Sequence, residues 1–316
     1  MKRYSMENSN MIGGVNMSRS SLLFLLLMSA MFFCIPTIFA QDRLPIRPRL
    51  GSKMREMKPL RDLIKRKDTV VVKTVFPAEF KGTSENIIVD STALLIPIFE
   101  RLRQIRSGLS DDTVRIVHVG DSHVRGHIFP QTTGDRLKDV FGSVDYTDKG
   151  INGGTCLTFT HPDRIADIVA QKPDFIILSL GTNESYGLRY NANTHYYQID
   201  ELVKLLQKSL PGIPILLTTP PGSYLHLRQR KRRRVYSMNP NTSLAAETIK
   251  KYGREHHLPT WDLYNIVGGK ERACKNWMEA KLMRSDHVHY LPEGYILQGN
   301  LLFQALIKAY NLYVAY

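Results

Sequence analysis

Three short apolar runs, separated by long segments with helical periodicity, constrain the fold of this 316-residue chain most strongly. The runs lie at 114–119, 174–180 and 214–219, and each has the length and composition of a buried parallel strand. Weaker strand candidates lie at 144–147 and 258–262. Apolar residues recur at three- and four-residue steps elsewhere, which predicts helices over 92–107, 129–141, 161–170, 195–209, 241–256 and 294–312.

Repeated strand–helix units imply right-handed crossovers and a parallel sheet with helices on both of its faces. We therefore predict an α/β fold over residues 84–316, a three-layer α/β/α sandwich around a mainly five-stranded parallel sheet. In such sheets the active site forms on the loops that leave the carboxyl ends of the strands. The loops after the predicted strands are therefore the places where functional residues are expected.

The first 40 residues are typical of a secretory signal peptide. Basic residues precede an uncharged run from Ser21 to Ala40, which predicts cleavage before Gln41. Met17 is an alternative start, because a complete signal follows it. The alternative to cleavage is a retained anchor, since about 20 apolar residues can span a bilayer. Both interpretations predict export to the periplasm or the cell exterior, where the protein can associate with the envelope, and cleavage leaves no stable transmembrane helix.

The formal net charge of +14 lies mostly outside the predicted domain. Residues 41–83 hold twelve basic and five acidic residues and predict a basic tether, whose run at 69–75 can add one strand to the sheet. A second basic run, on a loop after the strand at 214–219, contains Arg228, Arg230, Lys231, Arg232, Arg233 and Arg234. No aromatic residues are interleaved with this run, which argues against a nucleic-acid-binding protein. We hypothesise that the tether and this loop bind an anionic polymer or envelope surface; the alternative is a solvated loop.

Two loops after predicted strands carry residues that suit catalysis. Ser122 follows the first strand within Gly-Asp-Ser-His, where a strand-to-helix turn presents its hydroxyl at the sheet edge. Asn183 follows the strand at 174–180, and its amide can be directed at an oxyanion. The structural alternatives are a helix-capping serine and a turn-forming asparagine.

Two further loops complete the set. The glycines of 150–155 let a backbone N–H approach a ligand closely, although a tight turn is the simpler interpretation. Asp286 and His289 are spaced so that the carboxylate can hold one imidazole nitrogen while the other faces a serine. His287 is expected to be an ordinary surface histidine.

In their order and placement these four motifs resemble those of the SGNH/GDSL hydrolase family. Gly-Asp-Ser at 120–122 matches the nucleophile block, and 151–155 matches the glycine block with Gly153 at the oxyanion position. The asparagine block corresponds to 181–184, although Glu184 replaces the more usual Asp. Asp286 and His289 match the Asp-x-x-His block. The resemblance covers about residues 92–312, looks most like an exported subgroup from gut Bacteroidetes, and implies a flavodoxin-like sandwich.

This resemblance implies a serine ester hydrolase that needs no metal or other cofactor. Ser122 would attack the ester, His289 would take its proton, and Asp286 would orient the imidazole. The N–H groups of Ser122 and Gly153 and the amide of Asn183 would form the oxyanion hole.

The expected substrate is an acylated glycan. The enzyme would remove a small acyl group, O-acetyl, from a carbohydrate or from peptidoglycan. Trp261 and Trp277 can stack on a sugar ring, but core positions are the simpler interpretation. The alternatives are a lysophospholipase-type or broad-specificity esterase and an O-acetyltransferase with the same triad. A non-catalytic envelope-binding protein is a further alternative, against which the complete set of motif residues argues.

The cysteines allow one disulfide. Removal of the signal leaves only Cys156 and Cys274, which flank the glycine loop and the Asp-His loop, and export permits oxidation. We hypothesise that they pair and brace the site; the alternative is two buried free thiols.

Overall fold

A computed structural model describes residues 68–315, except 188 and 229–233. The predicted signal peptide and the tether before residue 68 lie outside the described residues. A six-stranded sheet has the order β1-β8-β5-β4-β2-β3. Its parallel strands are β2 (Val114–Gly120), β3 (Val144–Gly150), β4 (Phe175–Ser179), β5 (Ile215–Thr218) and β8 (Thr260–Trp261), and β1 (Ile88–Val89) pairs antiparallel with β8. The predicted parallel sheet is confirmed, with one antiparallel strand added at its edge.

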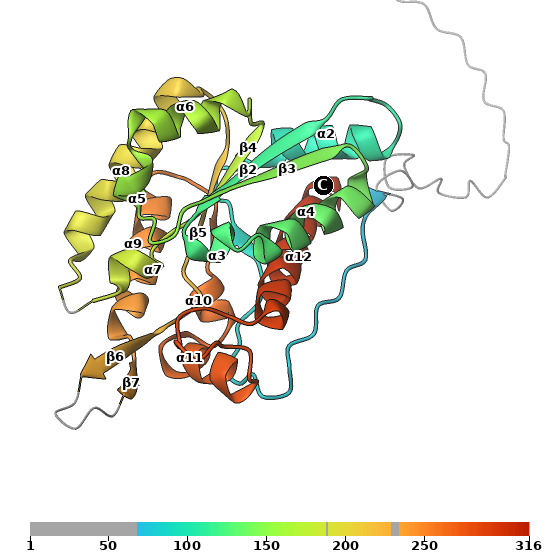
Figure 1. The fold of residues 1–316 in the computed structure, drawn as a ribbon. Coiled ribbons are helices and arrows are strands. Elements are labelled where there is room, and N and C mark those ends of the chain that lie inside the picture. Colours follow the sequence, from blue (N-terminus) through green and yellow to red (C-terminus); the bar gives the residue numbers. More distant parts are fainter. Residues whose placement is uncertain (1–67, 188, 229–233, 316) are drawn as a thin grey trace, which may run out of the picture. The chain divides into compact units, whose positions relative to one another are not determined.

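Helices cover both faces of the sheet because successive strand side chains point to opposite sides. In β2, for example, Ile116 packs into the apolar cluster on one face and Val117 into the cluster on the other. One face carries α2 (Ile96–Arg106), α4 (Ile128–Phe141) and α12 (Pro292–Ala315), and the other carries α6 (Pro162–Ala170), α8 (Ala192–Ser209) and α9 (Pro240–Glu255) (Figure 1). The predicted three-layer sandwich is therefore confirmed. None of the described helices has the length and apolarity needed to span a bilayer.

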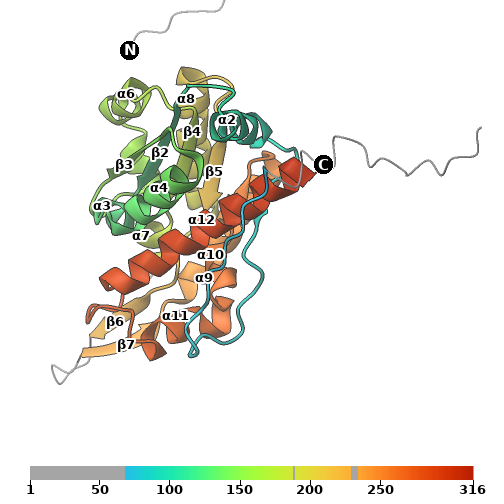
Figure 2. The same cartoon turned by 90° about the vertical axis from the view of Figure 1, so that its right-hand side faces the viewer.

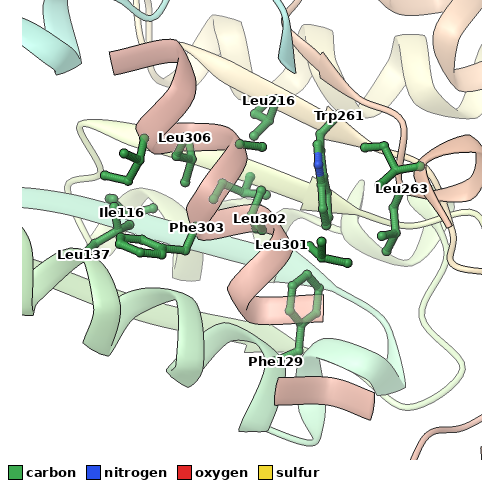
Figure 3. Close-up of a cluster of buried hydrophobic side chains, with 14 of the residues drawn as sticks. Ile116, Phe129, Leu137, Leu216, Trp261, Leu263, Leu301, Leu302, Phe303 and Leu306 are labelled. Carbon is green, nitrogen blue, oxygen red and sulfur yellow. The ribbon is translucent and has the colours of Figure 1, made fainter. Parts of the chain in front are cut away.

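The core beside α12 contains both tryptophans. Leu301 and Leu302 of α12 lie close to Trp261 and Leu216 of the sheet in this apolar cluster (Figure 3). Trp261 and Trp277 are completely buried, and each indole N–H is bonded, to Asn86 Oδ1 at 2.9 Å and to the carbonyl of Pro221 at 3.1 Å respectively. Neither indole is available to stack on a sugar, so the core interpretation is correct.

The described end of the tether, residues 68–83, packs along α12 (Figure 2). The backbone N–H of Val70 donates to Asn311 Oδ1, and Asn311 Nδ2 donates back to the carbonyl of Val70, both at 2.8 Å. Phe80 is buried and makes an edge contact with Trp277. The strand predicted at 69–75 is wrong, because Val70 pairs with a helix side chain instead of a neighbouring strand.

Several elements were not predicted. The short helices α3 (Ser122–Arg125), α5 (Cys156–Phe159), α7 (Thr182–Ser185) and α10 (Leu263–Ile266) begin in loops after strands, and α11 (Gly269–Glu279) precedes the Asp286 loop. The basic run was expected on an irregular loop, but its ends belong to a hairpin of β6 (Tyr224–Arg228) and β7 (Arg234–Met238), which closes with Arg228 opposite Arg234. Arg230, Lys231, Arg232 and Arg233 lie outside the described residues.

Candidate active site

The candidate nucleophile Ser122 lies where β2 turns into α3. Asp121 adopts an extended conformation and caps the helix, its Oδ1 accepting a hydrogen bond from the backbone N–H of His123 at 2.9 Å. Gly120 is needed before this turn, because a Cβ there would lie 2.3 Å from the Val124 side chain and 2.7 Å from the carbonyl of Ser179. The close approach of helix and neighbouring strand leaves Ser122 half-buried at the carboxyl edge of the sheet.

The structure brings Ser122, His289 and Asp286 into one hydrogen-bonded chain. His289 Nε2 lies 2.9 Å from Ser122 Oγ, and His289 Nδ1 lies 2.9 Å from Asp286 Oδ2. Burial tends to raise the pKa of Asp286, but hydrogen bonds from the backbone N–H groups of His289 and Val288 outweigh it and hold that pKa below its usual value. The ionised carboxylate fixes the proton of His289 on Nδ1, so Nε2 can accept the proton of Ser122.

His287 is not the ordinary surface histidine that was expected, because it is half-buried and packs against the β6–β7 hairpin. Its ring stacks on Tyr236 of β7 with centroids 4.0 Å apart, and its carbonyl accepts a hydrogen bond from the backbone N–H of Tyr224 at 2.9 Å. The residue has a φ of 58°, in the left-handed region. The hairpin therefore anchors the loop that carries Asp286 and His289, a role that no local sequence signal indicates.

Two of the three predicted oxyanion residues, Gly153 and Asn183, lie on adjoining loops. Gly153 is exposed and has a φ of 70°, a conformation that glycine adopts without strain. Asn183 Nδ2 donates to the carbonyl of Gly154 at 2.9 Å, which fixes the amide beside the glycine loop. A side-chain amide has two N–H donors, so the second remains available for a ligand.

Glu184 joins these loops, a role that the sequence analysis missed. Its Oε1 accepts a hydrogen bond from the backbone N–H of Cys156 at 2.7 Å, and its Oε2 accepts one from the N–H of Gly181 at 2.9 Å. The signal was the spacing of Glu184 three residues after Gly181, as in a capping box. The Glu184 side chain, which is longer than the more usual Asp at this position of the motif, spans both loops.

Two buried titratable groups flank Ser122 in sequence. Burial raises the pKa of Asp121 to about 7 and lowers the pKa of His123 to about 3. His123 Nδ1 is 3.0 Å from the hydroxyl of Tyr295, and its ring centroid lies 5.5 Å from that of His289. His123 is therefore a neutral packing partner beside His289.

The proposed disulfide is wrong, because Cys156 and Cys274 are both free and buried. Cys156 belongs to the apolar cluster beside α8, whereas Cys274 of α11 lies against Gly222, just before the β6–β7 hairpin. The Cys274 thiol donates to the carbonyl of Ser223 at 3.3 Å. The two thiols therefore contact different parts of the structure.

One group among the described residues has metal-ligand character: Cys156, Glu184 and His195, whose ligand atoms lie within 4.8 Å of one another. Both Glu184 oxygens already accept backbone hydrogen bonds. Burial and the neighbouring Glu184 raise the pKa of Cys156 well above its usual value, which favours the protonated thiol over the thiolate that binds metals.

Comparison with known proteins identifies relatives of the chain. The model of a family described as GDSL-like lipase/acylhydrolase matches residues 118–297. A solved structure described as a peptidoglycan O-acetylesterase shares the fold, with a TM-score of 0.62 and 16% identity over 71% of this chain and 99% of that one. A GDSL-like lipase from Bacteroides thetaiotaomicron has a TM-score of 0.46 and 21% identity over 68% of this chain and 99% of that one. No curated protein sequence matches the chain.

Proposed function

Because this chain belongs to the GDSL-like lipase/acylhydrolase family and is an ester hydrolase, we propose that it removes an O-acetyl group from a carbohydrate or peptidoglycan with Ser122, His289 and Asp286. The observation that carries the proposal is the position of His289, which lies 2.9 Å from a side-chain atom of each of the other two residues. A proton can pass from serine to imidazole without rearrangement of the loop.

The first half of the reaction forms an acyl-enzyme. Ser122 Oγ bonds to the ester carbonyl carbon while its proton moves to His289 Nε2, and Asp286 stabilises the resulting imidazolium. The tetrahedral intermediate collapses when the bond to the alcohol oxygen breaks and His289 returns the proton to that oxygen. The alcohol leaves, and the acetyl group remains on Ser122.

The developing negative charge needs donors that are already in place. Gly153 and Asn183 lie on loops that Glu184 holds together, so their N–H groups need little reorganisation as the oxyanion forms. The backbone N–H of Ser122 is the third donor in this proposal. Loss of one such donor typically lowers turnover about 100- to 1,000-fold.

Water completes the second half of the reaction. His289 Nε2 removes a proton from a water molecule, whose oxygen bonds to the acyl carbon. The bond to Ser122 Oγ then breaks, the serine recovers its proton from His289, and acetic acid leaves and ionises to acetate in solution.

The choice of acetyl and of a glycan carrier goes beyond the family assignment. The sequence has no long apolar lid segment, which favours a small acyl group over a fatty acid. The solved structure that shares this fold at a TM-score of 0.62 is described as a peptidoglycan O-acetylesterase, which is compatible with this choice.

Export and an anionic partner are further parts of the proposal. Residues 1–40 support cleavage before Gln41, and the basic runs support contact with an anionic polymer or envelope surface. N-terminal sequencing of the protein from a cell envelope fraction tests the first part. Neutralisation of the six basic residues from Arg228 to Arg234 tests the second, with a loss of affinity for an acidic polymer at low salt as the expected result.

The decisive test is acetate release by the wild type and by Ser122→Ala from a panel of O-acetylated glycans, peptidoglycan and 4-nitrophenyl acetate. We expect the variant to retain less than about one thousandth of the wild-type turnover. Retention of most of the activity by Ser122→Ala would overturn the catalytic assignment. Faster release of long fatty acyl groups than of acetyl would overturn the substrate assignment, and so would transfer to sugar in excess of hydrolysis.

A further inference from the structure

We propose that a cavity beside the Ser122 helix binds a carboxylate on the alcohol part of the ester, which makes acetylated acidic sugars the preferred substrates. This inference rests on the ester hydrolysis proposed above. The cavity has a volume of about 340 Å³ and lies at the carboxyl end of the edge strand β3. Its walls include Arg125, Lys149, Ile151, Phe159 and Arg164.

Two elements in the cavity wall, helix α3 and the loop after β3, also carry residues of the candidate active site. Arg125 ends α3, three residues after Ser122, and residues at this spacing are neighbours on a helix. Gly150 packs directly against this helix, because a Cβ there would lie only 2.1 Å from the backbone nitrogen of Arg125. Ile151 precedes Gly153 by two residues on the same loop. An ester bound with its carbonyl at Gly153 can therefore extend its alcohol part past Ile151 into the cavity.

Each carboxylate in the cavity wall already has a hydrogen-bonding partner. Lys149 Nζ lies 2.9 Å from Asp167 Oδ1, and Asp148 Oδ2 lies 2.7 Å from His127 Nδ1. Among the described residues, no carboxylate forms an ion pair with Arg125 or Arg164. Two guanidinium groups in the wall of one cavity thus lack an acidic partner within the described chain.

His127 holds Arg125 in place. Arg125 Nη1 lies 2.6 Å from His127 Nε2, and a guanidinium can only donate, so Nε2 is the acceptor. The proton of the imidazole is therefore on Nδ1, which donates to Asp148. The hydrogen bond to His127 uses one of the five N–H donors of Arg125 and restricts the motion of the arginine side chain. The remaining donors can bind a ligand with a smaller loss of conformational entropy.

The chemistry of the cavity suits an acidic sugar. Guanidinium groups bind carboxylates through two parallel hydrogen bonds, which a neutral hydroxyl group cannot match. Ile151, which is only partly buried, supplies apolar wall against which the carbon face of a sugar ring can pack. A cavity of this volume is at the small end of ligand pockets and can hold one sugar residue. A neutral glycan would leave the two guanidinium groups without partners.

The test compares two acetyl esters that differ only in charge, 3-acetoxybenzoate and 3-acetoxybenzamide, and repeats the comparison with the 4-acetoxy pair. Acetate release is measured for the wild type and for Arg125→Gln, Arg164→Gln and the double variant. Arg254→Gln, which changes an exposed arginine at the end of α9, is the matched control. O-acetylated pectin and O-acetylated xylan provide the same comparison of acidic with neutral carriers on polymers.

We expect the wild type to favour the carboxylate over the amide in kcat/KM, and the double variant to lose this preference by about tenfold, as for a charged hydrogen bond. Increasing salt should reduce the preference of the wild type but not that of the double variant. Arg254→Gln should keep the wild-type ratio.

An equal ratio in the wild type and the folded double variant would overturn the carboxylate site while leaving ester hydrolysis intact. A different result would overturn the proposed catalytic residues as well: the wild type releases acetate from neither ester, and Ser122→Ala does not slow the hydrolysis of any other ester. The wild type could instead hydrolyse a lysophospholipid faster than every acetyl ester, and the double variant could lose this activity. That result would assign the cavity to a phosphate group and overturn the proposal of an acidic sugar.

Discussion

The carboxylate of Glu184 accepts a hydrogen bond from the backbone N–H of Cys156, 28 residues earlier in the chain, at 2.7 Å. Its second oxygen accepts one from Gly181. The loop that carries Gly153 and the loop that carries Asn183 are thereby fixed to each other by one side chain. A residue that touches neither substrate nor nucleophile can therefore set the geometry of the proposed oxyanion hole.

Glu184→Gln should lower kcat for 4-nitrophenyl acetate by about tenfold or more, because a charged hydrogen bond is lost and an amide cannot accept at both ends. KM should change less than kcat, since the loops hold donors that stabilise the oxyanion of the transition state more than they stabilise the bound substrate. Glu184→Asp should retain more activity than Glu184→Gln because it keeps the charge. Glu201→Gln, at an exposed position of α8, serves as the control. Wild-type kcat in Glu184→Gln would show that the link has no catalytic effect.

His289→Ala should lower turnover of an acetyl ester by at least about 10³-fold, because Ser122 then lacks its proton acceptor. His287→Ala removes the stacking on Tyr236 and should lower turnover by less than about tenfold. Circular dichroism of both variants shows whether they fold. A larger loss in His287→Ala than in His289→Ala would reverse the assignment of the two histidines.

Asp121 should make the protein less stable as the pH rises. Burial raises its pKa to about 7, so between about pH 4 and pH 7 the unfolded chain loses a proton that the folded chain keeps, and unfolding becomes easier. Asp121→Asn removes this dependence while its side-chain oxygen can still cap α3. The Tm of Asp121→Asn minus that of the wild type should therefore increase from pH 4 to pH 7 by at least about 2–4 °C. A difference that is constant with pH would show that Asp121 is ionised in the folded protein.

The free cysteines predict the outcome of thiol titration. Protein that begins at Gln41 should show two titratable thiols after denaturation without reductant. The native protein should react slowly, because burial raises the pKa of Cys274 to about 11 and the pKa of Cys156 well above its usual value. Absence of titratable thiols in the denatured protein would restore the disulfide that the structure contradicts.

Local patterns in the sequence were sufficient for the fold. The apolar runs around Ile116, Ile176 and Leu216 have the length of buried strands and alternate with helical periodicity, and these features depend only on neighbours along the chain. Parallel strands end at one edge of a sheet, so the sequence also predicted that the loops of Ser122 and Asn183 lie at the same edge. Asp286 and His289 are three residues apart, and their contact follows from that spacing.

The sequence predicted less about contacts between distant segments. The strand-like run around Val71 was expected in the sheet, yet its neighbour Val70 is bonded to Asn311 of α12. The hairpin that anchors His287 was missed, since its two short strands are defined by pairing with each other. Cys156 and Cys274 looked like partners because their loops border one site, but Cys156 packs beside α8, whereas the Cys274 thiol lies against Gly222 and donates to the carbonyl of Ser223.

The sequence by itself determined the layers of this protein and which loops carry its candidate catalytic side chains, because periodicity and motif spacing are local properties. Only the tertiary structure decided that His289 reaches Ser122 across 167 residues, that Glu184 joins two loops and that Arg125 and Arg164 share a cavity wall. Each of these contacts depends on the packing of several elements at once. Such packing is a property of the assembled sheet and helices, and no single segment contains it.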